Sequence, residues 1–175
     1  MQLRIATPAD AAAIAHVQIE GWRTAYRGLV ADAFLDDLSC EKRTAQWTEN
    51  LKQPAQLTWV VTDPDVVAFA NSGPERTGRA DYRGELYAIY VLDARRRAGI
   101  GRQLFQQTVQ SFLDAGVENM LLWAFADNPY RRFYERLGGK LIDRQVIEIE
   151  GQRLNEVAYG WEDLARFLRT PIRSA

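Results

Sequence analysis

The eight residues from Arg95 to Arg102 combine four arginines with two glycines, in the order Arg-Arg-Arg-Ala-Gly-Ile-Gly-Arg. Glycine lets a backbone approach a ligand closely, and the first amides of a following helix have no partner inside the helix. The helix dipole and the arginines add positive charge at the same place. This segment therefore predicts a site for the phosphate groups of an anionic ligand. The candidate binding residues are Arg96, Arg97, Ala98, Gly99, Ile100, Gly101 and Arg102.

The residues on both sides of this segment support the prediction. The apolar run Leu86–Leu92 is typical of a buried strand, and Gln103–Ala115 has the spacing of a helix. A glycine motif is informative only in such a setting, a strand leading through a turn into a helix. The alternatives are a solvated basic turn or a nucleic-acid patch. A net charge of −1 for the whole chain favours local phosphate binding over both.

Length and composition narrow the class of protein. A chain of 175 residues with 47% hydrophobic residues predicts one domain, residues 1–175, with a core of its own. Cys40 and His16 are the only residues of their kinds, which argues against an intrachain disulfide and against a metal site of clustered histidines or cysteines. The near-neutral charge argues against nucleic-acid and membrane partners. With neither an export signal nor a long apolar run in the sequence, we expect a cytoplasmic protein.

The order of elements predicts an α/β fold of the α+β type, a mixed central sheet with helices on both faces. The expected strands are Leu3–Ala6, Leu57–Thr62, Val66–Ala70, Leu86–Leu92, Met120–Phe125, Lys140–Glu148 and Arg153–Trp161. The expected helices are Pro8–Tyr26, Ala31–Leu51 with a break near Ser39, Gln103–Ala115, Asn128–Leu137 and Glu162–Arg169. The polar segment Asn71–Gly84 is expected to be a long exposed loop.

Two segments in this order resemble the GNAT superfamily of N-acetyltransferases. Gly84-Glu85-Leu86-Tyr87-Ala88-Ile89-Tyr90-Val91, followed by Arg96-x-x-Gly99-x-Gly101, is similar to the family's acetyl-CoA signature. Asn128-Pro129-x-x-x-Phe133-Tyr134-Glu135-x-Leu137-Gly138 resembles its second conserved segment. The element order fits along nearly the whole chain. The resemblance implies a V-shaped sheet whose two middle strands splay apart.

The resemblance also implies how acetyl-CoA binds. The amides from Arg97 to Arg102 would hold the pyrophosphate, and the backbone of Ile89, Tyr90 and Val91 would pair with the pantetheine arm and polarise the thioester carbonyl. Asn128 would contact the same arm. Asn128 and Tyr134 are six residues apart, whereas the family usually has seven, so the alternative for Asn128 is a helix cap.

Direct attack of an amine on the thioester needs two proton-handling groups. The resemblance assigns the acid to Tyr134, whose alternative role is packing beside Phe133. It assigns the base to Glu85, whose alternative is an exposed carboxylate at the start of a strand. Glu156 and Tyr159, on the last strand, are held in reserve as bases.

The acceptor pocket is expected near the end of the first helix, where Trp22 and Tyr26 are four residues apart. Glu156 is expected to bind the acceptor with them. The alternative for the aromatic pair is packing in the core. The implied reaction is acetyl transfer to a primary amine of a small molecule or peptide, without a metal, and a homodimer is one expectation for the assembly. The competing functions are an acyl-CoA sensor or scaffold without turnover, and an enzyme that uses a longer acyl-CoA. A dinucleotide-binding fingerprint is excluded because its third glycine would fall at Leu104.

Overall fold

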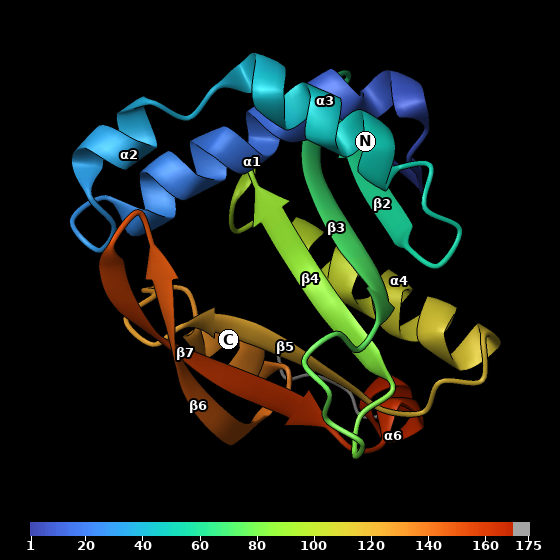
Figure 1. The fold of residues 1–175 in the computed structure, drawn as a ribbon. Helices are drawn as coiled ribbons and strands as arrows, with labels where there is room; N and C mark the ends of the chain where they lie inside the picture. The colour runs from blue at the N-terminus through green and yellow to red at the C-terminus, as the bar shows by residue number, and fades with distance from the viewer. Residues whose placement is uncertain (170–175) are drawn as a thin grey trace.

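The computed structural model describes residues 1–169 of the chain (Figure 1). Residues 170–175 of the expected domain 1–175 lie outside the described residues. The strands are β1 (Gln2–Ile5), β2 (Leu57–Thr62), β3 (Val66–Pro74), β4 (Gly84–Val91), β5 (Met120–Phe125), β6 (Lys140–Ile149) and β7 (Gln152–Trp161). The helices are α1 (Ala11–Tyr26), α2 (Asp32–Asp36), α3 (Cys40–Asn50), α4 (Ile100–Asp114), α5 (Arg132–Arg136) and α6 (Leu164–Arg169), with short 3-10 helices at Pro8–Asp10 and Asp93–Arg95.

These strands form one mixed sheet in the order β1-β2-β3-β4-β5-β7-β6. Neighbouring strands are antiparallel within the group β1-β2-β3-β4 and within the group β5-β7-β6. Strands β4 and β5 are parallel and pair only at Gly84–Met120 and Glu85–Leu121. Beyond these two pairs the strands diverge, as Figure 1 shows. The expected sheet, mixed and splayed at its middle strands, is confirmed.

Helices cover both faces of the sheet, as predicted. Successive side chains of a strand point to opposite faces. Val60 and Phe69 pack with α1 and α3, whereas Val61 and Ala70 pack with α4. The sheet therefore lies between two apolar layers, and β4 is held firmly between α1 and α4. In the part of the chain that the structure describes, no helix is long and apolar enough to cross a membrane.

The entry to α1 is fixed by the carboxylate of Asp10. It accepts two hydrogen bonds from the guanidinium of Arg4, at 2.8 and 2.7 Å, and one from the backbone N–H of Thr7 at 2.7 Å. Arg4 is the main reason, and Thr7 the second, that the pKa of Asp10 is lowered to about 2. The contacts join β1 to the start of α1, so Asp10 fixes the chain direction at this corner.

Asp10→Asn is expected to lower the free energy of unfolding at pH 7 by about 1–2 kcal/mol, since a pKa depressed below its ordinary value stabilises the ionised folded state. This stabilisation is present above pH about 4 and is lost as the pH falls towards 2. Urea denaturation of both proteins at pH 7 and pH 3 measures it. An equal loss at both pH values would contradict the electrostatic explanation.

The connection between β3 and β4 is shorter and less exposed than the expected loop Asn71–Gly84. Strand β3 continues through Pro74, and Asn71 is buried, with its amide donating to the hydroxyl of Thr58 at 2.9 Å. Tyr82, inside the remaining connection, is also buried. The prediction was wrong for Asn71–Pro74 because polar side chains there are satisfied by the neighbouring strand β2, a pairing that local composition does not reveal.

Candidate active site

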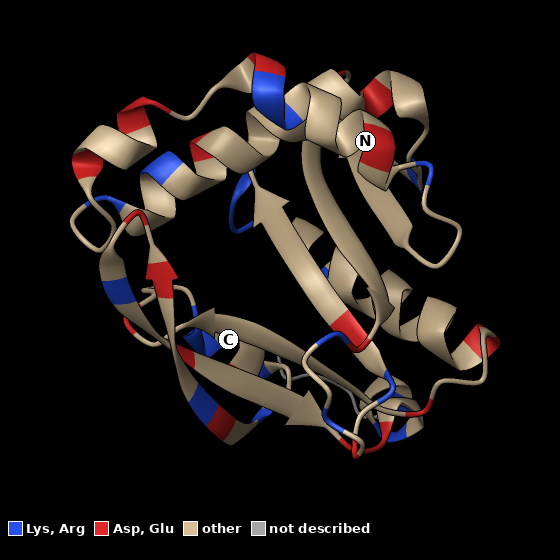
Figure 2. Ribbon diagram, in the orientation of Figure 1, with Lys and Arg blue, Asp and Glu red and all other residues tan. Residues whose placement is uncertain are grey.

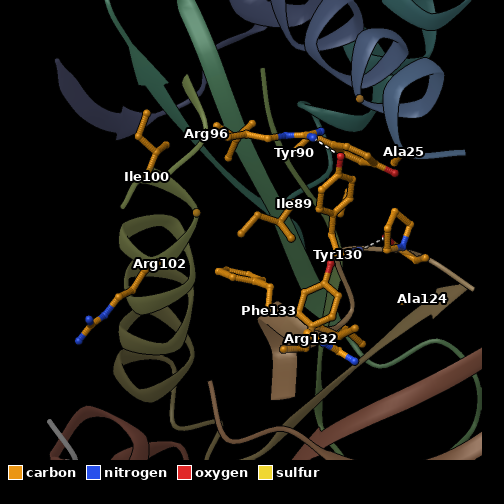
Figure 3. A pocket seen from close by; sticks show the side chains of 18 of the residues that line it. Ala25, Ile89, Tyr90, Arg96, Ile100, Arg102, Ala124, Tyr130, Arg132 and Phe133 are labelled. Carbon is orange, nitrogen blue, oxygen red and sulfur yellow. Dashed lines mark hydrogen bonds between the residues drawn. The ribbon is translucent and has the colours of Figure 1, made fainter. Parts of the chain in front are cut away.

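A cavity of about 850 Å³ opens where β4 and β5 separate. Its walls are β4, the turn between β4 and α4, the middle of β5, and the segment from Asn128 to Arg136; part of α1 closes it from the other face. Figure 3 shows the side chains around this cavity, with those of Ile89 and Phe133 near its centre. The predicted cofactor-binding residues lie together here. Ala98 alone among them does not contribute to the lining.

The edge of β4 that faces β5 has no partner strand after Glu85. The backbone N–H of Leu92 donates to the carbonyl of Val67 in the direction of β3, at 2.9 Å. Because successive amides of a strand point to opposite edges, those of Ile89 and Val91 point away from β3 and into the cleft. An extended ligand with amide groups can add to this edge as a further strand would.

A β-bulge marks the place where β4 changes its relation to β3. Asn71 lies opposite Ala88 and Ser72 opposite Leu86, so Tyr87 is the extra residue on β4. Bulges re-aim the backbone and occur often beside active sites. Tyr87 is fixed at this point because its hydroxyl donates to the carbonyl of Pro74 at 2.6 Å. The bulge lies among the residues that line the cavity.

The turn from β4 into α4 has the backbone of an anion-binding loop. Arg97 and Gly99 have φ values of 62° and 78°, in the left-handed region that only glycine adopts without cost. Left-handed residues in such a turn bring successive N–H groups to one concave side. Helix α4 begins at Ile100, and its first amides have no helical acceptor. Figure 3 shows that the side chain of Arg102 points away from the cavity, so any contact from this residue comes from its backbone.

Two of the arginines in this turn already have partners. Arg95 forms an ion pair with Asp63 at 3.3 Å, and Arg96 forms one with Asp93 at 2.9 Å. Arg96 also reaches across the cavity, where its guanidinium bonds to the hydroxyl of Tyr130 and lies 4.2 Å from the ring centroid (Figure 3). The Arg96–Tyr130 contact thus joins the two walls of the cleft.

Besides Arg102, whose side chain points away, three further arginines line the cavity, and none of these four takes part in an ion pair within residues 1–169. The three are Arg97 from the turn, and Arg132 and Arg136 from α5. Neither Arg132 nor Arg136 was predicted to bind a ligand. Their only signal in the sequence is two arginines four residues apart, which also fits an ordinary solvated helix face.

Tyr134 lies on the α5 wall of the cavity. Its ring packs against Phe133 and Tyr159, with centroid separations of 5.4 and 5.9 Å. Burial, assisted by Tyr26 and Tyr159 nearby, raises the pKa of Tyr134 well above its ordinary value. The phenol is therefore protonated across the physiological pH range, as an acid that gives a proton to a leaving group must be.

Asn128 lies at the beginning of the same wall and is buried. Its side-chain oxygen accepts a hydrogen bond from the backbone N–H of Tyr130 at 2.8 Å, which makes a turn. The regular helix consequently begins only at Arg132, later than the predicted start at Asn128. The turn alone explains the position of the Asn128 side chain, because its oxygen accepts the hydrogen bond from Tyr130. Neither a cap on the helix nor a contact with the pantetheine arm is needed for this.

Tyr26 reaches the cavity from α1, on the opposite side of β4 from α4. Its ring contacts those of Trp22 and Phe125 edge to face, with centroids 5.0 and 4.7 Å apart. Trp22 lies behind it, outside the lining. Trp22 therefore belongs to the packing and Tyr26 faces the cavity, and a role of either residue in binding the acceptor stays a prediction.

Tyr90 links α1 to the cleft. A side chain at Gly21 would place its Cβ 2.4 Å from the ring of Tyr90, so the absence of a side chain there allows β4 and α1 to approach. Burial raises the pKa of Tyr90 to about 12, and the neighbouring hydroxyl of Tyr26 opposes that rise. Tyr134 also acts on Tyr90 electrostatically. The phenols of Tyr26, Tyr90 and Tyr134 therefore meet near the cleft from three separate elements.

Glu85 lies at the start of β4 and is 3% exposed. Its carboxylate accepts hydrogen bonds from three nitrogens of Arg76: Nη2 at 2.7 Å, the backbone N–H at 3.0 Å and Nε at 3.2 Å. In Figure 2 the acidic start of β4 lies beside the basic connection that follows β3. Glu85 does not line the cavity. The contacts assign it a clear structural task, and its role as a base stays a prediction.

Glu156 lies on β7 opposite Phe125 and is partly exposed. Its carboxylate accepts a hydrogen bond from the amide of Gln145 at 2.8 Å and, within the described chain, forms no ion pair. Burial raises the pKa of Glu156, and the negative charge of Glu85 raises it further. Glu156 in turn acts on the phenol of Tyr26. It therefore lies beside the α1 wall, although it contributes to a separate shallow hollow and not to the cavity lining.

Known proteins are similar to this chain in sequence and in fold. A family model described as FR47-like protein matches residues 77–147. YuaI from Bacillus subtilis (strain 168), an uncharacterized N-acetyltransferase, is 35% identical over 155 residues, which cover 87% of each protein. The crystal structure of a GCN5-related N-acetyltransferase from Rhodopseudomonas palustris aligns with 91% of this chain and 93% of its own, with a TM-score of 0.72 and 19% identity. PaiA N-acetyltransferase from Thermoplasma acidophilum, solved in complex with coenzyme A, aligns with 89% and 98%, with a TM-score of 0.67 and 18% identity.

Proposed function

The chain belongs to the GNAT superfamily of N-acetyltransferases and is an acyltransferase, and from that premise we propose that it transfers the acetyl group of acetyl-CoA to a primary amine of a small molecule or peptide. The observation that carries the proposal is the unpaired edge of β4, which leads from the anion-binding turn to Tyr134 inside one cavity. A diphosphate, an amide-bearing arm and a thioester occur in this order in acetyl-CoA.

The cleft accounts for binding in three parts. The amides from Arg97 to Arg102 hold the diphosphate at the start of α4. The amides of Ile89 and Val91, which point into the cleft, pair with the pantetheine arm. In this proposal a backbone amide in the segment from Ile89 to Val91 also polarises the thioester carbonyl, because a fixed donor aimed at developing negative charge lowers the barrier.

The reaction is a direct attack in a ternary complex. The neutral amine nitrogen forms a bond to the carbonyl carbon, and the carbonyl π electrons move to oxygen. When the tetrahedral intermediate collapses, the C–S bond breaks and its electron pair leaves on sulfur. Tyr134 gives its proton to that sulfur, and the nitrogen loses a proton to a base. The products are the acetamide and CoA with a free thiol.

Two carboxylates compete for the role of base. Glu85 was predicted from the family pattern, but its oxygens are engaged by Arg76. The carboxylate of Glu156 accepts a hydrogen bond from Gln145, has a raised pKa and acts electrostatically on Tyr26. A raised pKa makes a carboxylate a better proton acceptor. We therefore place Glu156 ahead of Glu85 as the base, acting directly or through water.

Glu156→Gln is expected to lower kcat/KM about 10²-fold, at the lower end of general-base effects, and to remove one ionisation from the acidic limb of the pH profile. Activity depends on the ionised carboxylate, so in the wild type this limb falls as the pH drops through the raised pKa of Glu156. Glu85→Gln is expected to reduce mainly thermal stability, because it breaks a buried carboxylate's contacts with Arg76. Glu148→Gln, an exposed carboxylate on the same hairpin, is the control.

The reverse result for the two variants would identify the other carboxylate as the base. If Glu85→Gln removes activity without loss of stability while Glu156→Gln keeps the wild-type pH profile, Glu85 is the base.

The proposed reaction is tested by release of CoA thiol from acetyl-CoA in the presence of a panel of primary amines, with the acetylated product identified by mass. Acetyl-CoA binding without release from any amine would favour the sensor or scaffold. Faster release from a longer acyl-CoA than from acetyl-CoA would favour an enzyme with a different donor.

A further inference from the structure

In the proposed reaction, the acceptor amine and its base belong to different hollows of the molecule. The amine attacks the thioester inside the cavity, whereas Glu156 lines the separate shallow hollow and not the cavity. A base takes up a proton across a hydrogen bond, either directly or through one intervening group. The proton of the amine therefore has to reach Glu156 through a group that lies between the cavity and this carboxylate.

Aromatic rings form the wall between the two places. Phe125 lies directly opposite Glu156 in the β5–β7 pair, so both side chains are on one face of the sheet, with Cβ atoms about 5 Å apart. The ring of Tyr26 packs edge to face on that of Phe125, with centroids 4.7 Å apart, and both residues are only 7% exposed. Figure 1 shows the end of α1, which is Tyr26, beside the hairpin of β6 and β7. Tyr26 therefore lies between the cavity and the face of the sheet that carries Glu156.

Tyr26 brings a hydroxyl to this wall and interacts with charged or polar groups on both of its sides. Burial raises the pKa of Tyr26 well above its ordinary value, and the phenol of Tyr90 and the charge of Glu156 add to the rise. On the cavity side, Tyr26 also acts electrostatically on Tyr134, the proposed acid. The phenol of Tyr26 thus stays protonated, and its oxygen can accept one proton while it donates another.

Glu156 is placed to receive a proton and to release it again. Burial raises the pKa of Glu156, and the negative charge of Glu85 raises it further, so uptake of a proton is favoured. The side chain is partly exposed in the shallow hollow, where its carboxylate accepts a hydrogen bond from Gln145 at 2.8 Å. A proton taken up by Glu156 can therefore pass to solvent without crossing the site of acetyl transfer.

We propose that the phenol of Tyr26 carries the proton of the acceptor amine out of the cavity to Glu156, which makes Tyr26 a further catalytic residue. The proposal rests on the proposed function, because it gives the route of a proton that this reaction must lose. The N–H bond of the tetrahedral intermediate breaks and its electron pair stays on nitrogen, while an O–H bond forms at the oxygen of Tyr26. The original O–H bond of the phenol breaks in the same step, and its proton joins a carboxylate oxygen of Glu156. Tyr26 is left as a neutral phenol, and the neutral carboxyl group returns the proton to water.

The test is a double-mutant cycle of Tyr26→Phe and Glu156→Gln, measured by release of CoA thiol from acetyl-CoA with the fastest primary amine of the panel. Tyr26→Phe keeps the ring that packs on Phe125 and removes only the hydroxyl. It is expected to lower kcat/KM about 10²-fold, as Glu156→Gln does, because both variants interrupt the same proton path. The double variant is expected to lie within about twofold of the slower single variant, since one path can be lost only once. The dissociation constant of acetyl-CoA, from titration calorimetry, should change by less than about twofold in all three variants.

Tyr82→Phe is the matched control. It removes a phenol hydroxyl from another buried tyrosine, one that does not line the cavity, and it is expected to keep the wild-type rate. Thermal melting of each variant checks that the chain still folds.

Three outcomes would overturn the assignment. They are a wild-type rate in either single variant, losses in the two single variants that multiply in the double variant, and a loss in Tyr26→Phe with equally weaker binding of acetyl-CoA, which would indicate packing. A wild type that releases no thiol with any amine is a different result, because it would refute the proposed function itself.

Discussion

Tyr134→Phe is expected to lower kcat by about 10²- to 10⁴-fold, the range for loss of a general acid, while the dissociation constant of acetyl-CoA changes less than about twofold. The variant keeps the ring that packs against Phe133 and Tyr159 and removes only the hydroxyl. Without it, the thiolate leaves unprotonated. Steady-state kinetics with a reactive amine, together with calorimetric titration of acetyl-CoA, measure the two quantities separately.

The pH dependence gives this expectation a second check. Because burial holds the pKa of Tyr134 well above its ordinary value, the phenol stays protonated on the alkaline side, and it should contribute no loss of activity below pH about 10. Tyr82→Phe, which removes a buried hydroxyl outside the cavity, is the control and should retain wild-type kcat. An equal loss of kcat and of acetyl-CoA affinity in Tyr134→Phe would mean that the residue acts through packing.

Gly99→Asp is expected to weaken acetyl-CoA binding by about 10²-fold, or roughly 3 kcal/mol, because it puts a negative charge where the diphosphate is held. No atom lies within 4 Å of a Cβ built at Gly99, so the effect does not come from a clash inside the protein. The residue precedes α4, whose first amides form the anion site. Titration calorimetry measures the loss.

Gly99→Asn separates charge from backbone strain. The φ of 78° at this position disfavours any side chain, and asparagine tolerates the left-handed region about as well as aspartate does. Both variants therefore lose similar stability, but only the aspartate repels phosphate. Unchanged affinity in Gly99→Asp would contradict the assignment of the turn as the diphosphate site.

The parts of the molecule that could be predicted are those whose signals are local. The strand from Leu86, the turn at Gly99 and the helix after it follow one another in sequence, and the structure has them in that order. Ser39 illustrates the same point, since its side chain accepts from the N–H of Lys42 at 3.2 Å and separates α2 from α3 as expected. Local chemistry is sufficient for these features.

The parts that could not be predicted depend on distant partners. The sequence around Glu85 does not show that its carboxylate is bonded to Arg76, which lies nine residues earlier on the connection after β3. Asn71 looked like a loop residue because its partner, Thr58, belongs to another strand. The arginine pair of α5 reads as a solvated helix face, and only the folding of α5 beside the turn before α4 reveals its place at the cavity.

The central claim is that the cleft between β4 and β5 binds acetyl-CoA, and calorimetric titration of the wild-type chain with acetyl-CoA tests it most directly. We expect one site per chain and a dissociation constant in the micromolar range that is common for enzyme substrates. Addition of a reactive amine to the same sample should then release CoA thiol. Absence of binding at acetyl-CoA concentrations up to about 1 mM, the upper end of common substrate affinities, would contradict the proposed function.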